Sequence, residues 1–279
     1  MLIAAGKKLL DALPGKSGRL PLFLIGGPCV IEDEAHSLSL ADRIRSICEK
    51  LDIPFIFKAS FDKANRSSLS SYRGPGLEKG LKILSRIRES IGVPVLSDVH
   101  ETWQVGPAAE VLDVLQIPAF LCRQTDLLLE VGRTQKPVNL KKGQFLSPSE
   151  IKNAVEKITS TGNQKIFLTE RGTLFGYQNL VVDMRAIPIM SGLGFPVVID
   201  ASHSVQKPGG EGTCSGGEAN DIPLIARCGI AAGAAGVFCE IHDNPPEALS
   251  DKYNSLLLYD LEPFLRSLIR IRSALDTDQ

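Results

Sequence analysis

The sequence has no excess of charge of either sign and no long apolar segment. Its 279 residues carry 31 Lys and Arg against 32 Asp and Glu, a net charge of −1. This balance gives the whole molecule no attraction to nucleic acid or to a membrane surface, so any basic site must be local. The longest early apolar run, residues 20–25, is far too short to span a bilayer. We therefore expect neither a nucleic acid nor a membrane as partner.

The six cysteines include no close pair such as Cys-x-x-Cys. Residues 1–13 carry Lys7 and Lys8 but no long apolar region after them, so a cleavable signal pattern is absent as well. Dispersed cysteines in such a chain indicate reduced thiols, and we expect a cytoplasmic protein.

A Gly-x-Gly-x-x-Gly turn, typical of dinucleotide-binding folds, does not follow the first apolar run. Instead, short apolar runs alternate with helix-length amphipathic segments such as 34–51 and 77–91. Continuous apolar strands separated by helices are typical of a parallel sheet covered by helices. The predicted strands are residues 21–25, 54–58, 94–96, 111–117, 137–140, 165–168, 196–199 and 236–239.

Eight such units are the number that closes a TIM (β/α)8 barrel, and the length of the chain suits that fold. We predict a single α/β barrel domain over residues 1–279, with a short N-terminal extension of about residues 1–20. An open doubly wound sheet is the alternative.

A chemically reactive side chain lies at or near the end of each predicted strand. In a barrel these side chains converge on one face, where the active sites of this fold lie. Long loops follow the last two strands, at residues 204–217 and 242–256, and are candidate lids. The strand-end residues are Cys29, Lys58, Asp98, Gln116, Lys141, Arg171, His203 and Glu240.

The segment 58–68 after the second strand contains Lys58, Lys63 and Arg66 without a matching run of acids. Ammonium groups, a guanidinium fork and small hydroxyl or amide donors together can hold more than one anionic group. A solvated basic loop is the alternative, but the polar ends of the other strands favour a site.

This segment, Lys-Ala-Ser-Phe-Asp-Lys-Ala-Asn-Arg-Ser-Ser, resembles the 3-deoxy-D-manno-octulosonate 8-phosphate synthase family. The resemblance extends from about Gly26 to about Glu240 and includes Ser-Asp-Val-His-Glu (97–101), Lys-Pro-Val-Asn-Leu-Lys-Lys (136–142), Thr-Glu-Arg-Gly (169–172) and Ile-Asp-Ala-Ser-His-Ser (199–204). It implies a transferase that condenses phosphoenolpyruvate with D-arabinose 5-phosphate and releases phosphate. It also implies a cytoplasmic homotetramer that supplies a sugar of lipopolysaccharide.

Three alternatives remain open. The related 3-deoxy-D-arabino-heptulosonate 7-phosphate synthases use erythrose 4-phosphate, but usually carry a Pro-Arg-Thr-Ser type sequence where this chain has Ala-Asn-Arg-Ser-Ser at residues 64–68. A Schiff-base aldolase would use Lys58 or Lys141 as its imine-forming amine. A non-catalytic barrel that binds sugar phosphates is the third.

The resemblance implies that Lys141 and Arg171 bind the phosphate of phosphoenolpyruvate, and that Gln116 is an amide of the same pocket. It places Lys58, Ser60 and Lys63 at the carboxylate and the reacting end. The catalytic residues that we predict are Lys58, Lys63, Asp98 and His203.

For arabinose 5-phosphate, the resemblance implies that Asn65, Arg66 and Ser67 hold the phosphate. Arg123 resembles an arginine that reaches this phosphate from a neighbouring subunit. Asp98 matches an aspartate near the sugar hydroxyls, although an N-cap of the helix that begins near Glu101 is an alternative role. His100 is either structural or part of the site.

The family divides into members with a metal-binding cysteine and members with asparagine at the position of Cys29. Cys29, His203, Glu240 and Asp251 match the four metal ligands of the first group. A thiolate, an imidazole and two carboxylates can accept Zn²⁺, Fe²⁺ or Mn²⁺. A small buried hydrophobic residue is the alternative role for Cys29. The chain departs from the family pattern at Lys252-Tyr253, where relatives have Gly-Pro, and at Glu218, where a basic residue is common.

Overall fold

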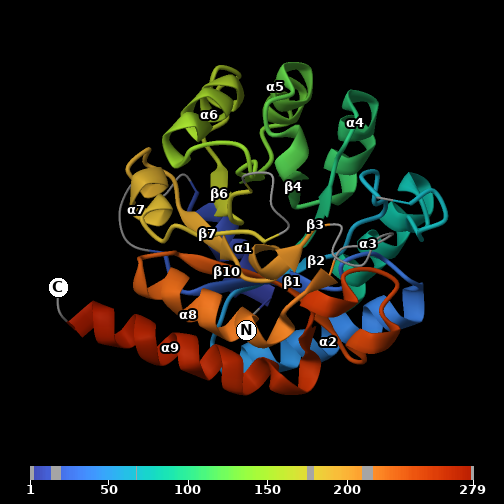
Figure 1. Cartoon of the computed structure of the whole chain (residues 1–279). Helices are drawn as coiled ribbons and strands as arrows, with labels where there is room; N and C mark the ends of the chain where they lie inside the picture. Colours follow the sequence, from blue (N-terminus) through green and yellow to red (C-terminus); the bar gives the residue numbers. More distant parts are fainter. Residues whose placement is uncertain (1–2, 14–19, 67, 175–178, 209–215, 278–279) are drawn as a thin grey trace.

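A closed ring of parallel strands forms the centre of the molecule (Figure 1). The computed structural model describes residues 3–13, 20–66, 68–174, 179–208 and 216–277. The ring follows the order β1-β2-β3-β4-β5-β6-β7-β10, and β1 also pairs with β10. These strands are Phe23–Gly27, Phe55–Lys58, Val95–Asp98, Val114–Ile117, Val138–Lys141, Ile166–Glu170, Val197–Asp200 and Gly236–His242.

Helices surround this ring on the outside, except for the N-terminal helix of residues 3–11, whose leucines pack against the apolar residues inside the ring (Figure 1). The predicted TIM barrel is therefore confirmed, and the open doubly wound sheet is wrong because the β1–β10 pairing leaves no open edge. The helices are α1 Ile3–Asp11, α2 Glu34–Lys50, α3 Leu77–Ile91, α4 Thr102–Val111, α5 Thr125–Arg133, α6 Ile151–Thr159, α7 Ala186–Ser191, α8 Ile222–Ala231 and α9 Leu261–Thr277. None of the described helices has the length and apolar character needed to cross a membrane.

Most strand boundaries differ from the prediction by one to three residues, and one predicted strand overlaps a helix. The apolar pattern of residues 111–117 predicted a single strand, but α4 continues to Val111 and Leu112 ends that helix. The strand β4 therefore begins only at Val114. An apolar helix end beside an apolar strand gives no sequence signal for the boundary.

The side chains inside the ring form two layers, one apolar and one polar. The lower layer is apolar and is made of Phe23, Ile25, Ile56, Leu96, Val114, Phe167, Val198 and Phe238, with leucines of the N-terminal segment packed against it. Because strand side chains alternate between faces, the residue two positions further along points into the same interior. These upper residues are polar and buried: Lys58, Asp98, Gln116, Thr169, Asp200 and Glu240.

The two predicted lid loops lie at this polar end. The first loop contains a short antiparallel pair, β8 Gln206–Lys207 and β9 Gly216–Gly217. The glycines of this loop at positions 209, 210 and 212 lie outside the described residues. The second contains the 3₁₀ turns η5 Pro245–Glu247 and η6 Lys252–Asn254 and leads into β11 Leu256–Leu257, which pairs with the end of β10.

Replacement of Phe167 by Ala should destabilise the barrel. Its ring is fully buried, and its centroid lies 5.2 Å from that of Phe23. The lost burial and the resulting cavity should lower the free energy of unfolding by about 3–5 kcal/mol. Denaturant unfolding measures this change. Leu224→Ala, a truncation of a half-exposed side chain on α8, serves as the control and should cost much less.

Candidate active site

A buried ion pair between Lys58 and Glu240 lies at the mouth of the barrel. Lys58 Nζ donates to Glu240 Oε1 at 2.7 Å and to the carbonyl oxygen of Cys29 at 2.9 Å. The two side chains come from β2 and β10, on either side of β1. Gly27 of β1 leaves space between the strands, since a Cβ there would lie 2.2 Å from the Lys58 carbonyl oxygen. Each charge is compensated by the other, as burial requires.

A second buried pair joins Lys141 of β5 to Asp200 of β7. Asp200 Oδ2 accepts hydrogen bonds from Lys141 Nζ at 2.7 Å and contacts His203 Nδ1 at 2.8 Å. Lys141 Nζ also lies 3.7 Å above the centre of the Phe238 ring. Burial opposes the charge of Asp200, but His203 and then Lys141 outweigh it and hold the pKa of Asp200 far below its ordinary value. Burial itself lowers the pKa of Lys141.

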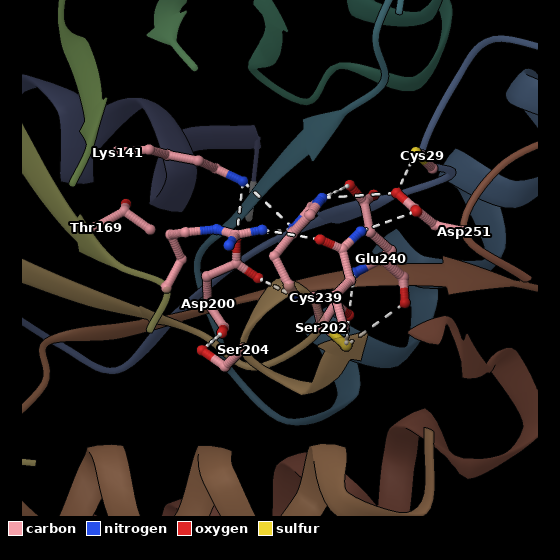
Figure 2. Close-up of polar contacts among 12 residues, drawn as sticks. Cys29, Lys141, Thr169, Asp200, Ser202, Ser204, Cys239, Glu240 and Asp251 are labelled. Atoms are coloured by element: carbon pink, nitrogen blue, oxygen red, sulfur yellow. Dashed lines mark hydrogen bonds and ion pairs between the residues drawn. The ribbon is translucent and has the colours of Figure 1, made fainter. Parts of the chain in front are cut away.

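Cys29, Glu240 and Asp251 lie close together beside these pairs (Figure 2). His203 contacts both of these carboxylates. Cys29 Sγ donates to Asp251 Oδ2 at 2.8 Å, and His203 Nε2 lies 3.6 Å from both Glu240 Oε1 and Asp251 Oδ2. Burial, followed by the carboxylate of Asp251, raises the pKa of Cys29 to about 12. The fold thus gathers one thiol, one imidazole and two carboxylates from the loop after β1, from η3 His203–Val205, from β10 and from the second lid loop.

This group fits a divalent metal ion. Ligand atoms of Cys29, Glu240 and Asp251 lie within 4.8 Å of one another, and the buried Glu240 Oε2 has no hydrogen-bond partner within the part of the chain that the structure describes. Asp200 occupies Nδ1 of His203, so Nε2 faces the two carboxylates. In metal sites, the ring nitrogen of a ligand histidine that does not face the metal usually donates to a carboxylate.

A ladder of buried hydrogen bonds connects the four neighbouring strands β3, β4, β5 and β6 inside the barrel. Gln116 Nε2 donates to Asp98 Oδ1 at 2.6 Å, Asn139 Nδ2 donates to Gln116 Oε1 at 2.7 Å, and Thr169 Oγ1 donates to Asn139 Oδ1 at 2.6 Å. Asp98 Oδ2 accepts from Ser60 Oγ at 2.5 Å. An ionised carboxylate only accepts, so Asp98 sets the orientation of both amides.

The alternative role of Asp98 as a helix cap is wrong. Glu101 is the N-cap of α4 and forms a capping box with Gln104. Asp98 instead ends β3 and points into the barrel. Burial opposes its charge, but Lys63 and then Lys58 lower its pKa. His100 is half-buried beside Phe61 and lines the cavity.

Two adjoining cavities of about 390 and 300 Å³ open above these residues and share Lys63, Arg171 and His203 in their walls. Arg171 donates through Nη2 to Gln206, whereas its buried Nη1 has no hydrogen-bond partner among the described residues. Burial opposes the charge of Lys63, yet the acidic groups around it, led by Cys29 and Asp98, raise its pKa. The cavity walls therefore offer fixed cations to an anionic ligand.

The remaining predicted residues lie at the rim or outside it. Asn65 is exposed and Arg66 is half-buried, with Arg66 Nε donating to the carbonyl oxygen of Tyr72 at 3.1 Å. Ser67 lies outside the described residues. Arg123 is exposed and does not line either cavity of its own chain.

A second group of possible metal ligands consists of Glu32, His36 and His242. The backbone N–H of Asn244 donates to His242 Nδ1 at 2.9 Å, so the neutral ring carries its proton on Nε2, 3.4 Å from Glu32 Oε1. Glu32 Oε1 also accepts from the Leu249 N–H at 2.8 Å. This arrangement is a hydrogen-bonded anchor for the loop that carries Asp251.

Comparison with known proteins places this barrel in a family. The model described as the DAHP synthetase I family matches residues 10–277. The chain belongs to the DAHP synthetase I family. Among curated relatives, the "2-dehydro-3-deoxyphosphooctonate aldolase" of Desulfatibacillum aliphaticivorans is 59% identical over 254 residues, which cover 91% of this chain and 93% of the relative. Proteins of the same name from Geobacter sulfurreducens (55% identical; 90% and 92% covered) and Desulfosudis oleivorans (57%; 92% and 92%) are also similar.

These relatives confirm the resemblance to 3-deoxy-D-manno-octulosonate 8-phosphate synthases that the sequence predicted. Sequence reasoning nevertheless missed several side chains of the site. Asn139, Thr169 and Asp200 lie in the motifs that carry the family resemblance, but the sequence assigned no role to them. The alternation of side chains along the strands could have identified them. Thr169 and Asp200 each follow an apolar residue of the barrel interior by two positions. Asn139 lies opposite Phe167 in the pairing of β5 with β6.

Replacement of Asp200 by Asn should lower the free energy of unfolding at pH 7 by about 3 kcal/mol, because Lys141 loses its buried partner. The pKa of Asp200 is lower in the folded state, so its stabilisation is present above the unfolded value of about 3.9 and is lost as the pH falls below it. The variant should therefore show a shallower loss of stability below about pH 4 than the wild type. Denaturant unfolding at several pH values measures both effects, and parallel curves would contradict the assignment.

Proposed function

We propose that the chain condenses phosphoenolpyruvate with D-arabinose 5-phosphate and water to give 3-deoxy-D-manno-octulosonate 8-phosphate and phosphate. The name shared by its relatives supports this activity. The single observation that carries the proposal is a set of fixed cations around a cavity with a buried thiol–imidazole–carboxylate group beside it. Two phosphorylated substrates need such cations, and an aldehyde needs an electrophilic partner.

Phosphoenolpyruvate would lie on the inner cations. Arg171 Nη1 has no protein partner among the described residues, and Lys141 is held by Asp200 next to the same cavity. Both suit the phosphate, while Lys58, Ser60 and Lys63 suit the carboxylate and the reacting end. Gln116 offers an oriented amide. The rigid strand ends hold this substrate in one register, which is a large part of what a condensation of two reactants requires.

Arabinose 5-phosphate would lie towards the rim. Asn65, Arg66 and Ser67 follow β2 and suit its phosphate, with Arg123 of a neighbouring subunit as a further cation. The exposure of Arg123 and its distance from the cavities of its own chain are compatible with this role. The homotetramer and the cytoplasmic location remain predictions.

In the reaction, C3 of phosphoenolpyruvate bonds to the aldehyde carbon, and water adds at C2. The resulting hemiketal expels phosphate by cleavage of the bond between C2 and oxygen. Lys63 keeps its proton among the surrounding acids and stabilises the negative charge that develops on the aldehyde oxygen. Asp98 stays ionised and accepts hydrogen bonds from Ser60 and Gln116, which it holds in place. Its carboxylate has further lone pairs that can accept a hydrogen bond from a sugar hydroxyl.

Cys29, His203, Glu240 and Asp251 would hold a divalent ion, Zn²⁺, Fe²⁺ or Mn²⁺. When bound, such an ion supplies Lewis-acid chemistry that polarises a carbonyl or lowers the pKa of water. The unpartnered Glu240 Oε2 supports this role. Asp200 keeps Nε2 of His203 directed to that place through its contact with Nδ1.

The rival activities have less support. Lys58 donates to Glu240 and Lys141 donates to Asp200, so both amines are engaged as ammonium donors rather than as nucleophiles. This disfavours the Schiff-base aldolase. The three relatives reported above share the name 2-dehydro-3-deoxyphosphooctonate aldolase, which favours the octulosonate reaction over the use of erythrose 4-phosphate. The populated strand ends disfavour a purely binding role.

A phosphate-release assay tests the proposal. With phosphoenolpyruvate present, arabinose 5-phosphate should release phosphate and erythrose 4-phosphate should not. A chelator should remove the activity, and one of the three metal ions should restore it. Preferential turnover of erythrose 4-phosphate would instead support the heptulosonate synthase, and a covalent adduct after borohydride reduction would support the imine.

Arg171→Ala should reduce turnover and phosphoenolpyruvate affinity together, because the guanidinium holds the phosphate when the substrate binds and holds it more strongly in the transition state. Loss of a charged contact should reduce kcat/KM by at least about tenfold. Arg185→Ala is the matched control, since Arg185 is exposed and pairs only with Asp183 among the described residues. Steady-state kinetics of both variants give the answer, and unchanged constants for Arg171→Ala would remove Arg171 from the site.

A further inference from the structure

Two buried charged residues, Lys142 and Glu170, have no part in the chemistry described above. Their side chains are 0% and 1% exposed, and Lys142 Nζ lies 3.6 Å from Glu170 Oε2. Each is the chain neighbour of a phosphate-site cation: Lys142 follows Lys141, and Glu170 precedes Arg171. Neighbours in an extended chain point to opposite faces, so this pair lies behind the wall that the two cations form.

Lys142 connects the loops that follow β5 and β6. Its ammonium group donates to the carbonyl oxygens of Gly143 and Leu146 at 3.2 Å, both in the first loop. It also contacts the carbonyl oxygen of Gly172 at 3.5 Å and Thr173 Oγ1 at 3.4 Å in the second loop. One cation therefore fixes the backbone of both loops.

Glu170 secures the second loop from the other side. Its Oε1 accepts a hydrogen bond from the Gly172 N–H at 2.6 Å, directly after Arg171. Gly172 has a φ of 88°, in the left-handed region that favours glycine. A backbone bond from Leu174 N–H to the Gln144 carbonyl oxygen, 3.1 Å long, joins the same two loops.

Stability alone does not explain this pair. Replacing a buried ion pair by apolar residues is often neutral or stabilising, so such a pair is weak evidence of a stabilising role. A charge that contacts the backbone of two loops restricts their relative position more than apolar packing does, because hydrogen bonds are directional.

We propose that Lys142 and Glu170 are positioning residues that fix the spacing between Lys141 and Arg171 and thereby set the affinity for the phosphate group of phosphoenolpyruvate. The identity of the ligand rests on the proposed function. The pair itself touches no substrate and acts only through the two loops.

The test compares Lys142→Met and Glu170→Gln with wild type and with a control. Arg272→Met is the matched control, because Arg272 is a buried cation that donates to the carbonyl oxygens of Leu20 and Ala234 at the opposite end of the barrel. Calorimetric titration with phosphoenolpyruvate alone measures binding without turnover, and thermal unfolding shows that each variant is folded.

Lys142→Met should weaken phosphoenolpyruvate binding by about tenfold or more, as expected for cations displaced by a fraction of an ångström. The KM for arabinose 5-phosphate should change less than twofold. Glu170→Gln keeps an acceptor for Gly172 and should show a smaller loss, of about threefold. Arg272→Met should lower the melting temperature and leave phosphoenolpyruvate binding unchanged.

Unchanged phosphoenolpyruvate binding in folded Lys142→Met would overturn the proposal. If that variant does not fold, Glu170→Gln decides: binding equal to wild type rejects the proposal, and weakened binding at a wild-type melting temperature supports it. Wild-type protein that binds phosphoenolpyruvate but releases no phosphate with arabinose 5-phosphate would reject the proposed function and leave the positioning role standing.

Discussion

The buried pairing of Lys58 with Glu240 and of Lys141 with Asp200 is the constraint on which the site depends. An uncompensated charge at this depth would lose its proton or gain one, and the cavity would lose its fixed electrostatics. Each pair joins two strands that flank a third strand in the ring, so each pair forms only when three neighbouring strands have assembled. The fold and the charge state of the site are therefore coupled, and the apolar layer beneath them supplies the stability that this arrangement requires.

The hydrogen-bond ladder adds direction to this charge arrangement. Amides have two chemically different ends, and a buried amide without a charged neighbour can adopt either orientation. Asp98 removes that freedom for Gln116, and Gln116 then removes it for Asn139. The site consequently presents one pattern of donors and acceptors to its ligand, fixed by a single ionised carboxylate.

Much of the fold and part of the site follow from the sequence. The eight apolar runs identified the strands because parallel barrel strands are buried on both faces, and a reactive residue at the end of a run is visible as a break in hydrophobicity. Asp200, Asn139 and Thr169 were missed because their partners lie on strands far away in sequence. The cap role of Asp98 was wrong because the local pattern gives no information on contacts across the barrel. The sequence pattern is compatible with a surface role for Lys142, and only the structure shows that its side chain is buried.

The gradient of burial from Arg171 to Asn65 has an evolutionary consequence. Under the proposed function, the cations for phosphoenolpyruvate lie at the strand ends, where a substitution disturbs folding, whereas the exposed Asn65 and the half-buried Arg66 lie on a loop that contributes little to the core. Mutations in that loop can alter the choice of the second substrate at small thermodynamic cost. Barrels of this kind can thus diversify in the sugar they accept while the enolpyruvate half of the chemistry is preserved.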